Sequence, residues 1–427
     1  MENMRVRRGT FRLCVLMLGL WLASAAARAD AVLEWNTIAV NTAVANHQNP
    51  FAQARTLAIV QVAVFEAVNS ITGDYQPYLG IPSPQDASPE AAAIEAAYEV
   101  LSKYFGTTSQ VSLDAALASS LATIPDGQAK SDGIQAGHNA AQAMIALRAN
   151  DGSSPALVKT PGPAVPGEWQ ATSSCPKNMS GVAVGIAFQW QYIVPFGLAS
   201  VSEFLLPPPP VLTGIAYTKA YNEVMTVGEV DSTVRPQDRA NVALFFAATS
   251  PTQAFNQAAQ WVAGERGGSL SDNARALALI NMAINDSLVA SFFNKYQYNF
   301  WRPETAIHAG DIDGNPKTQA DSDWAPFVTT PCFPSYPSNH GSAGNAAAEV
   351  LRRLYGEAGH SITLSNPAVP TIVLQYDSFK EITDDISDAR VYGGIHFRTD
   401  QEAGADLGRA VGTAVFKNNL RPVHNND

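Results

Sequence analysis

Cysteine is scarce in this sequence. Three cysteines occur among 427 residues, and one of them, Cys14, lies in an apolar N-terminal stretch. There is no Cys-x-x-Cys pair and no cysteine–histidine cluster, which argues against a cysteine-ligated zinc site and against covalent haem attachment. Cys175 and Cys332 could form one disulfide if they meet in space, and the sequence alone leaves that open.

Charged residues are also few. They make up 15% of the chain against 46% hydrophobic residues, so the chain is globular rather than disordered. The formal net charge is −11, which argues against nucleic acid as a partner because the protein would repel a polyanion. Any anion site must therefore be a local cluster of cations within an acidic protein.

The N-terminus is typical of an export signal. Four arginines precede the apolar run "LCVLMLGLWLASAAA", which is short for a membrane anchor, and Ala27–Ala29 offers a small-x-small cleavage site. We predict that residues 1–29 are a signal peptide and that the mature protein is periplasmic or secreted. Cleavage removes five of the 27 basic and one of the 38 acidic side chains, so the mature net charge is −15. We expect no membrane span after residue 29.

Several familiar patterns are missing. The chain lacks a Gly-rich phosphate loop, a Gly-x-Ser-x-Gly elbow, a His-Glu-x-x-His motif, an internal repeat and clear β alternation. Helical periodicity dominates instead, as in "ARTLAIVQVAVFEAVNSI" and "AAAIEAAYEVLSKYF". These features predict an all-α protein built from packed helical bundles.

The expected organisation is one large helical domain over residues 30–427. Residues 30–150 are N-terminal helices. Residues 150–212 are a long irregular Pro/Gly-rich connector, with "GSSPALVKTPGPAVPGEW" and "LLPPPPVL". Residues 213–427 are helical again, and they contain the three segments that carry chemistry.

The first segment is "KYQYNFWRP", in which Lys295 and Arg302 stand seven residues apart among aromatics. Cations in so apolar a stretch need a partner. If one helix continues from Lys295 to Arg302, both project from the same face. Taken alone, the pair is equally well explained as two long side chains that extend to solvent at a helix end.

The second segment is "YPSNHGSAGNAAAEVLRRLY". Ser338 is a plausible N-cap, so the backbone N–H groups of Asn339, His340 and Gly341 would point outward at the positive end of a helix dipole, where anions bind. By itself, the segment is more simply an ordinary capped helix with a surface histidine.

The third segment is "ARVYGGIHFRTD". Arg390 precedes a glycine pair, and His396 and Asp400 stand four residues apart on an expected helix, hence on one face. A carboxylate on one imidazole nitrogen fixes the tautomer and makes the other nitrogen a better nucleophile or ligand. Alone, this pair is more often a surface feature.

Together, Lys-x6-Arg-Pro, Pro-Ser-x-His and Arg-x5-His-x3-Asp resemble the signature of the type 2 phosphatidic acid phosphatase and vanadium haloperoxidase superfamily. The resemblance implies four side chains that hold the oxygens of vanadate or phosphate, namely Lys295, Arg302, Ser338 and Arg390. It implies that His396 bonds the vanadium or phosphorus, that His340 is an acid–base group, and that Asp400 orients His396. Asn339 replaces the usual glycine, and Ala389 replaces a usual serine.

The chain is further similar to the bacterial vanadium-dependent haloperoxidase family, through "FWRP" and "WQYIVPFGLASVSEFLLPPPPVL" in its long N-terminal region. That similarity implies two four-helix bundles, as in chloroperoxidases, with the cofactor at the end of one. It also implies an enzyme that uses hydrogen peroxide to oxidise a halide, with a small organic acceptor. Phe333 lies where chlorinating members carry an aromatic residue.

Two alternatives stay open at this stage. One is an exported acid phosphatase that cleaves phosphate monoesters through a phosphohistidine at His396. The other is a non-catalytic helical protein that only binds an oxyanion, suggested by Asn339 and Ala389. The sequence names neither the halide, the acceptor nor the oligomeric state.

Overall fold

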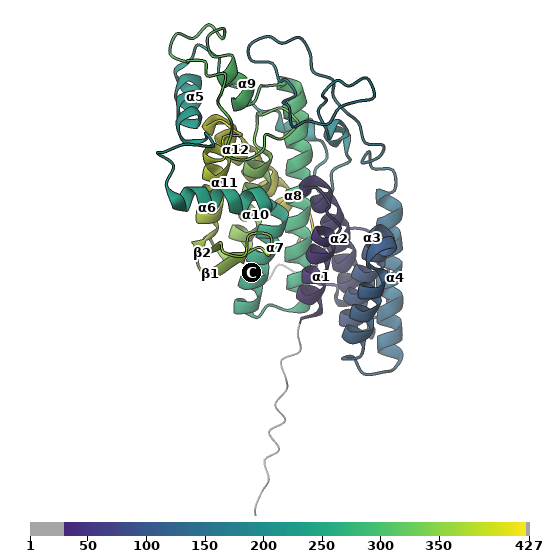
Figure 1. Ribbon diagram of the computed structural model, residues 1–427. Coiled ribbons are helices and arrows are strands. Elements are labelled where there is room, and N and C mark those ends of the chain that lie inside the picture. Colours follow the sequence, from purple (N-terminus) through teal and green to yellow (C-terminus); the bar gives the residue numbers. More distant parts are fainter. Residues whose placement is uncertain (1–29, 424–427) are drawn as a thin grey trace, which may run out of the picture.

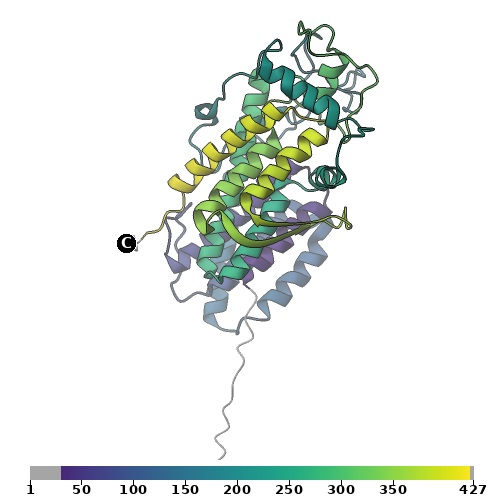
Figure 2. The same ribbon diagram turned by 90° about the vertical axis from the view of Figure 1, so that its left-hand side faces the viewer.

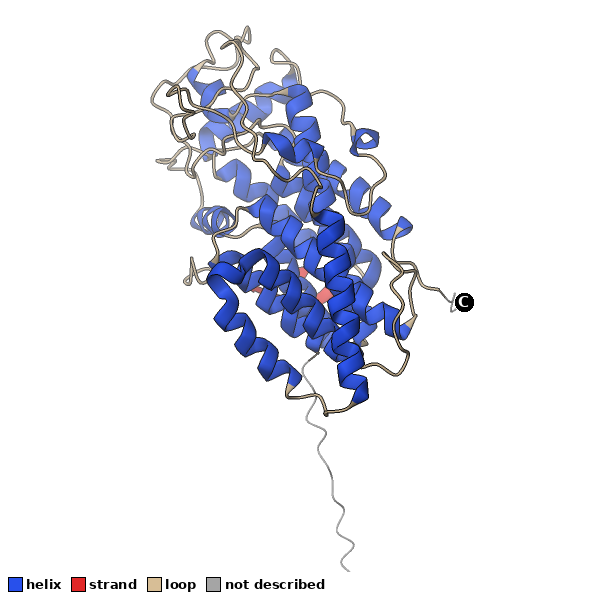
Figure 3. Ribbon diagram, turned by 90° about the vertical axis from the view of Figure 1, so that its right-hand side faces the viewer, coloured by secondary structure: helices blue, strands red, loops and turns tan. Residues whose placement is uncertain are grey.

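The computed structural model describes residues 30–423, so the predicted signal peptide lies outside the described residues. The described residues form twelve α-helices and one small two-stranded sheet, and 58% of these residues are helical (Figure 1). The predicted all-α fold class is confirmed. Figure 3 shows how little of the fold is strand.

The N-terminal bundle consists of four helices: α1 (Ala31–Ala45), α2 (Pro50–Thr72), α3 (Pro89–Leu121) and α4 (Gln128–Arg148). The Asp30, Asn49 and Ser88 side chains cap the first three by accepting hydrogen bonds from free backbone N–H groups. Small residues allow α3 and α4 to lie close together. A methyl group at Gly137 would come within 2.5 Å of the Ala92 carbonyl oxygen.

The C-terminal half contains the other helices. They are α5 (Ile215–Val227), α6 (Gln237–Ala248), α7 (Pro251–Arg266), α8 (Leu270–Tyr298), α9 (Pro303–His308), α10 (Asn339–Tyr355), α11 (Phe379–Tyr392) and α12 (Arg398–Asn418). Helix α10 packs against α12, α8 and α11, and α12 also packs against α8. Figure 2 shows the yellow α12 alongside the green α10.

The α10–α12 contact depends on glycine. Gly404, Gly408 and Gly412 recur every four residues, so they form one stripe along α12. A methyl group at Gly404 would lie 2.7 Å from the Ser338 carbonyl oxygen, and one at Gly412 would lie 2.6 Å from the Ala346 carbonyl oxygen. Because these three positions carry no side chain, the backbone of α12 lies directly against that of α10, and the N-terminal ends of the two helices come together.

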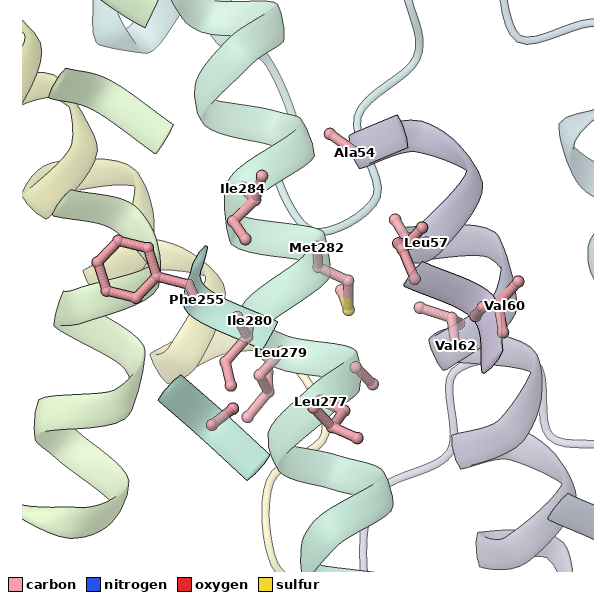
Figure 4. Packing of buried hydrophobic residues seen from close by; sticks show 14 of the residues in the cluster. Ala54, Leu57, Val60, Val62, Phe255, Leu277, Leu279, Ile280, Met282 and Ile284 are labelled. Atoms are coloured by element: carbon pink, nitrogen blue, oxygen red, sulfur yellow. The ribbon is translucent and has the colours of Figure 1, made fainter. Parts of the chain in front are cut away.

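Helix α8 connects the two halves of the core. It packs on α2 through one face and on α10 and α12 through others, so one continuous hydrophobic cluster spans both sides (Figure 4). The expectation that no segment after residue 29 is long and apolar enough to cross a bilayer was wrong. Both α2 and α8 are long and apolar enough by length and composition. In each helix, however, 94% of the most apolar 18-residue stretch is buried inside the protein, as in core helices.

A β-hairpin that the sequence analysis did not anticipate follows α10. Strands β1 (Ala358–Ser365) and β2 (Val373–Ser378) pair antiparallel. Their alternation is weak because His360, a polar residue, shares the buried face of β1 with Ile362 and Leu364. The hairpin packs on α7 and α11.

The connector over residues 150–212 contains only two short 3₁₀ helices, Phe188–Tyr192 and Val201–Phe204. Its irregular backbone is satisfied by charged side chains of the helices. Asp286 of α8 accepts hydrogen bonds from the N–H groups of residues 196–198, and Arg148 donates to the Val194 and Pro195 carbonyls. The connector is thus an ordered part of the fold.

The two mature cysteines do meet. Cys175 in the connector and Cys332 before α10, which are 157 positions apart in sequence, form a disulfide with Cα atoms 5.4 Å apart. The bond ties the connector to the loop that carries "PSYPSNH".

We predict that removal of this disulfide lowers the free energy of unfolding by about 2–4 kcal/mol, because it closes a long loop. Guanidinium unfolding of the Cys175→Ser/Cys332→Ser double variant measures the loss. The oxidised wild type should move to the same midpoint when reductant is added, while the double variant should not respond to reductant. An unchanged midpoint in the double variant would contradict the prediction.

Candidate functional site

Lys295 and Arg302 come together, but not in the way that was expected. Helix α8 ends at Tyr298, and Asn299 turns the chain out of the helix with a left-handed backbone, φ 46°. The next residues run extended beside the connector, where the Trp301 N–H donates to the Gly167 carbonyl. The prediction of one shared helical face was therefore wrong, and the turn at Asn299 is the reason.

The Lys295 ammonium is completely buried at the C-terminal end of α8. It donates to three backbone carbonyls of the next segment, those of Pro334, Ser335 and Pro337, at 2.8, 2.8 and 2.5 Å. An ammonium has three donors, so all are engaged. Burial, followed by the nearby Arg302 charge, lowers the pKa of Lys295 well below its usual range, whereas the three carbonyl acceptors need three N–H donors and so favour the charged ammonium.

Arg302 is also completely buried, at the start of α9. Its Nε donates to the Phe333 carbonyl at 2.9 Å, and its Nη1 donates to the Ile395 carbonyl at 2.8 Å and lies 2.9 Å from His396 Nε2. Its Nη2 has no hydrogen-bond partner. Burial lowers the pKa of Arg302 to about 9, so the guanidinium still carries its charge at neutral pH.

His396 and Asp400 are in contact, as expected from the sequence, but His396 does not lie on the helix as was expected. Helix α12 begins at Arg398, so His396 precedes the helix instead of standing on its face. Its Nδ1 lies 2.9 Å from Asp400 Oδ2. Burial, and then the Arg302 charge, hold the pKa of His396 well below its usual value, so the ring is neutral. With Nδ1–H donated to Asp400, Nε2 carries the lone pair.

Ser335 completes this arrangement. Its hydroxyl donates to Asp400 Oδ2 at 2.5 Å and lies 3.3 Å from His396 Nδ1. Burial raises the pKa of Asp400 to about 6, and the Ser335 hydrogen bond opposes that rise. Ser335 was not predicted from the sequence. The signal that could have found it is the repeated Pro-Ser pair in "PSYPS", of which only the second serine was predicted to belong to the site.

The start of α10 is close to the prediction. Ser338 is the N-cap, its Oγ accepts from the Gly341 N–H at 3.1 Å, and its N–H donates to the Asp400 carbonyl at 2.9 Å. The amide of Asn339 faces α8, where its oxygen accepts a hydrogen bond from Ser291 at 2.7 Å. The side chain that replaces the usual glycine thus has a partner outside the anion-binding end of the helix.

Arg390 and His340 stand together beside the same space. Arg390, at the end of α11, donates through Nη1 to the Phe246 carbonyl at 3.1 Å, and its buried Nε has no partner. Burial lowers the pKa of Arg390 to about 10. Burial and then Arg390 hold the pKa of His340 well below its usual value, so this imidazole is neutral as well. Ala389 is completely buried behind them.

A cavity of about 560 Å³ opens onto these groups. Its wall includes five of the residues discussed above: Phe333, Asn339, His340, Arg390 and His396. Lys295, Arg302 and Ser338 are not among its lining residues. Phe333 covers both buried cations, with its ring centre 5.3 Å from Lys295 Nζ and 5.1 Å from Arg302 Cζ.

The charge balance fits an oxyanion. Lys295, Arg302 and Arg390 are buried cations, and Asp400 is the carboxylate among the grouped residues. Within residues 30–423, two guanidinium nitrogens, Arg302 Nη2 and Arg390 Nε, are buried donors without acceptors. Buried donors of this kind are costly unless a bound group satisfies them, and an anion with several oxygens suits them.

The Ser335 hydrogen bond has a testable pH dependence. The Asp400 carboxyl is neutral at pH 5 and ionised at pH 8, because its pKa is about 6. A hydrogen bond to the ionised form is the stronger one, so Ser335→Ala should cost about 2 kcal/mol at pH 8 and clearly less at pH 5. Denaturant unfolding at both pH values measures this difference.

The matched control is Ser287→Ala, which removes a buried hydroxyl that donates to the Ile284 carbonyl on α8. Its cost should not change with pH. An equal cost of Ser335→Ala at both pH values would contradict the role assigned to Ser335.

The chain resembles vanadium-dependent haloperoxidases in sequence and in fold. Residues 275–425 match the family model of the VCPO second helical-bundle domain. Vanadium chloroperoxidase from Curvularia inaequalis is 27% identical over 183 residues, which is 32% of this chain and 29% of that protein. The match thus spans less than a third of that curated relative.

Solved structures extend the likeness over most of the chain. A bacterial vanadium-dependent iodoperoxidase aligns over 93% of this chain and 97% of its own, with a TM-score of 0.76 and 25% identity. An apo-type bacterial vanadium-dependent chloroperoxidase covers 87% and 94%, with a TM-score of 0.70 and 16% identity, which is a likeness of fold. The chain is therefore vanadium-haloperoxidase-like, with the haloperoxidase fold and with a VCPO second helical-bundle domain at residues 275–425.

Proposed function

We propose that this protein is a vanadate-dependent haloperoxidase. The observation that carries the proposal is the pairing of a neutral His396, held by Asp400, with two buried guanidiniums whose free N–H donors have no acceptor. A tetrahedral oxyanion such as vanadate or phosphate would satisfy those donors. The names of the related proteins support vanadate over phosphate.

Each residue has a definite part in holding the cofactor. His396 would offer the Nε2 lone pair to vanadium. Asp400 with Ser335 fixes the proton on Nδ1, and Arg302 Nη1, which donates to Nε2 at 2.9 Å, would give up that contact when vanadate binds. Arg302 and Arg390 offer donors to the oxygens. Lys295 adds positive charge from behind the 334–337 loop. Ser338 and the first N–H groups of α10 bring the positive helix end to the site.

The overall reaction would oxidise a halide by two electrons. Hydrogen peroxide, halide and one proton give hypohalous acid and water, so the O–O bond breaks and a halogen–oxygen bond forms. Bound vanadate supplies the Lewis-acidic centre at which hydrogen peroxide is activated for this transfer. The buried cations stabilise the negative charge that develops on oxygen.

His340 is the group placed to move the proton. It faces the cavity, and its low pKa leaves it neutral and able to accept a proton from hydrogen peroxide at neutral pH. The same group can return the proton to the departing water.

We also infer that the protein is exported. The Arg-rich start and the apolar run of residues 1–29 support an export signal, and the Cys175–Cys332 disulfide suits a periplasmic or extracellular environment.

A parallel assay of one purified sample tests the proposed activity. With orthovanadate, hydrogen peroxide and bromide, the protein should brominate a phenol dye. His396→Ala should abolish this activity, and His340→Ala should lower it about 100-fold as expected for loss of an acid–base group. His308→Ala, an exposed histidine outside the cavity wall, is the matched control and should retain full activity.

The same sample without vanadate is assayed for phosphate monoester cleavage. Ester cleavage that vanadate inhibits, together with no bromination, would contradict the proposal and favour the acid phosphatase alternative.

A further inference from the structure

The cavity is far larger than the small reactants need. Hydrogen peroxide and a halide ion each occupy little more space than a water molecule, about 30 Å³. The cavity measures about 560 Å³ and thus falls within the usual range for pockets that enclose an organic ligand, about 300–1,000 Å³. The cavity therefore has room for an organic molecule in addition to hydrogen peroxide and a halide ion.

The cavity wall contains both polar and apolar residues. We call its three site residues, His340, Arg390 and His396, the floor, and its large apolar residues the sides. The sides contain three aromatic rings and two aliphatic side chains from different parts of the chain: Phe51, Phe327, Phe333, Ile186 and Leu288. A pocket with apolar sides and a few polar groups at one end is typical of sites for small organic molecules.

The apolar sides are held in place by their own contacts. The Phe51 ring packs edge-on against Trp190 at 4.7 Å and against Phe292 at 5.5 Å between ring centres. Phe333 packs edge-on against the same Phe292 at 5.3 Å. The cavity is therefore preformed, so an occupant does not have to order these rings on binding.

Two further contacts make the wall rigid. The Arg235 guanidinium lies 3.7 Å from the centre of the Phe327 ring, which is part of the wall. Cys332 is part of the wall and is bonded to Cys175 of the connector. Aromatic rings fixed in this way favour an aromatic occupant, because ring–ring contacts add to apolar burial.

The charges at the floor restrict the occupant further. Arg390 lines the cavity, and Lys295 and Arg302 lie buried behind the floor, so a cationic molecule would be repelled. A hydroxyl group at the floor would meet a hydrogen-bonding partner in His340, which lines the cavity.

We propose that this cavity binds the organic acceptor itself, and that the acceptor is a small uncharged aromatic molecule of the phenol or naphthol class. The aromatic ring would lie among Phe51, Phe327 and Phe333, with its hydroxyl toward the floor. This inference rests on the proposed haloperoxidase function. Hypohalous acid formed at the floor would react there. Its halogen–oxygen bond breaks as a carbon–halogen bond forms, and its oxygen leaves with the ring proton as water.

Binding is measured without turnover, by calorimetric titration of 2-naphthol into the full mature protein in the absence of vanadate. We expect one saturable site. Ile186→Trp and Leu288→Phe fill the cavity from the connector and from α8, and each should weaken binding at least tenfold while native helical circular dichroism is retained. A cationic analogue, 2-naphthyltrimethylammonium, should bind at least tenfold more weakly than 2-naphthol.

The matched control is Val211→Trp, a similar enlargement at a connector position that is 72% exposed and outside the cavity wall. It should bind 2-naphthol like the wild type. No saturable binding, or binding that survives both cavity-filling substitutions, overturns the inference.

The outcome separates this inference from the proposed function. Naphthol binding that both substitutions weaken supports the cavity assignment even if vanadate produces no bromination. Bromide oxidation by a protein that does not bind naphthol overturns the cavity assignment and leaves the haloperoxidase function intact.

Discussion

The ammonium of Lys295 holds the two sides of the site together. It belongs to α8, the central core helix, yet its three donors all go to the loop before α10. That loop places Ser335 against Asp400 and Ser338 at the start of α10. A buried ammonium needs all its hydrogen bonds, so the loop has little freedom to move away. The orientation of His396 follows from that constraint through Asp400.

The three motifs were sufficient to predict which segments meet, because their charged and polar side chains need hydrogen-bond or charge partners when they are buried. A buried lysine, two buried arginines and a capped helix start can be satisfied together only around a shared anion or shared acceptors. Their helical placement was predicted less well. Asn299 ends α8 before Arg302, and His396 precedes α12, so both side chains reach the site from residues outside these helices. Spacing along an assumed helix cannot reveal where the helix ends.

Other features depended on contacts between distant residues, which no local pattern records. Ser335 acts through Asp400, 65 residues away in sequence. Cys175 and Cys332 meet only because the connector folds back over the loop before α10. The hairpin was missed because His360 interrupts the apolar alternation of β1. In each case the deciding information is tertiary.

The geometry of the site also depends on the glycine stripe of α12, although these glycines contribute no side chain to the site. Gly404, Gly408 and Gly412 let α12 lie against the backbone of α10, and the first of them meets the carbonyl of Ser338 itself. The distance between the two helices therefore determines how the N-terminal end of α10 is aligned with His396 and Asp400. Mutational tolerance along α12 should therefore be lowest on this face without side chains, including at Gly412, about three helical turns from Asp400.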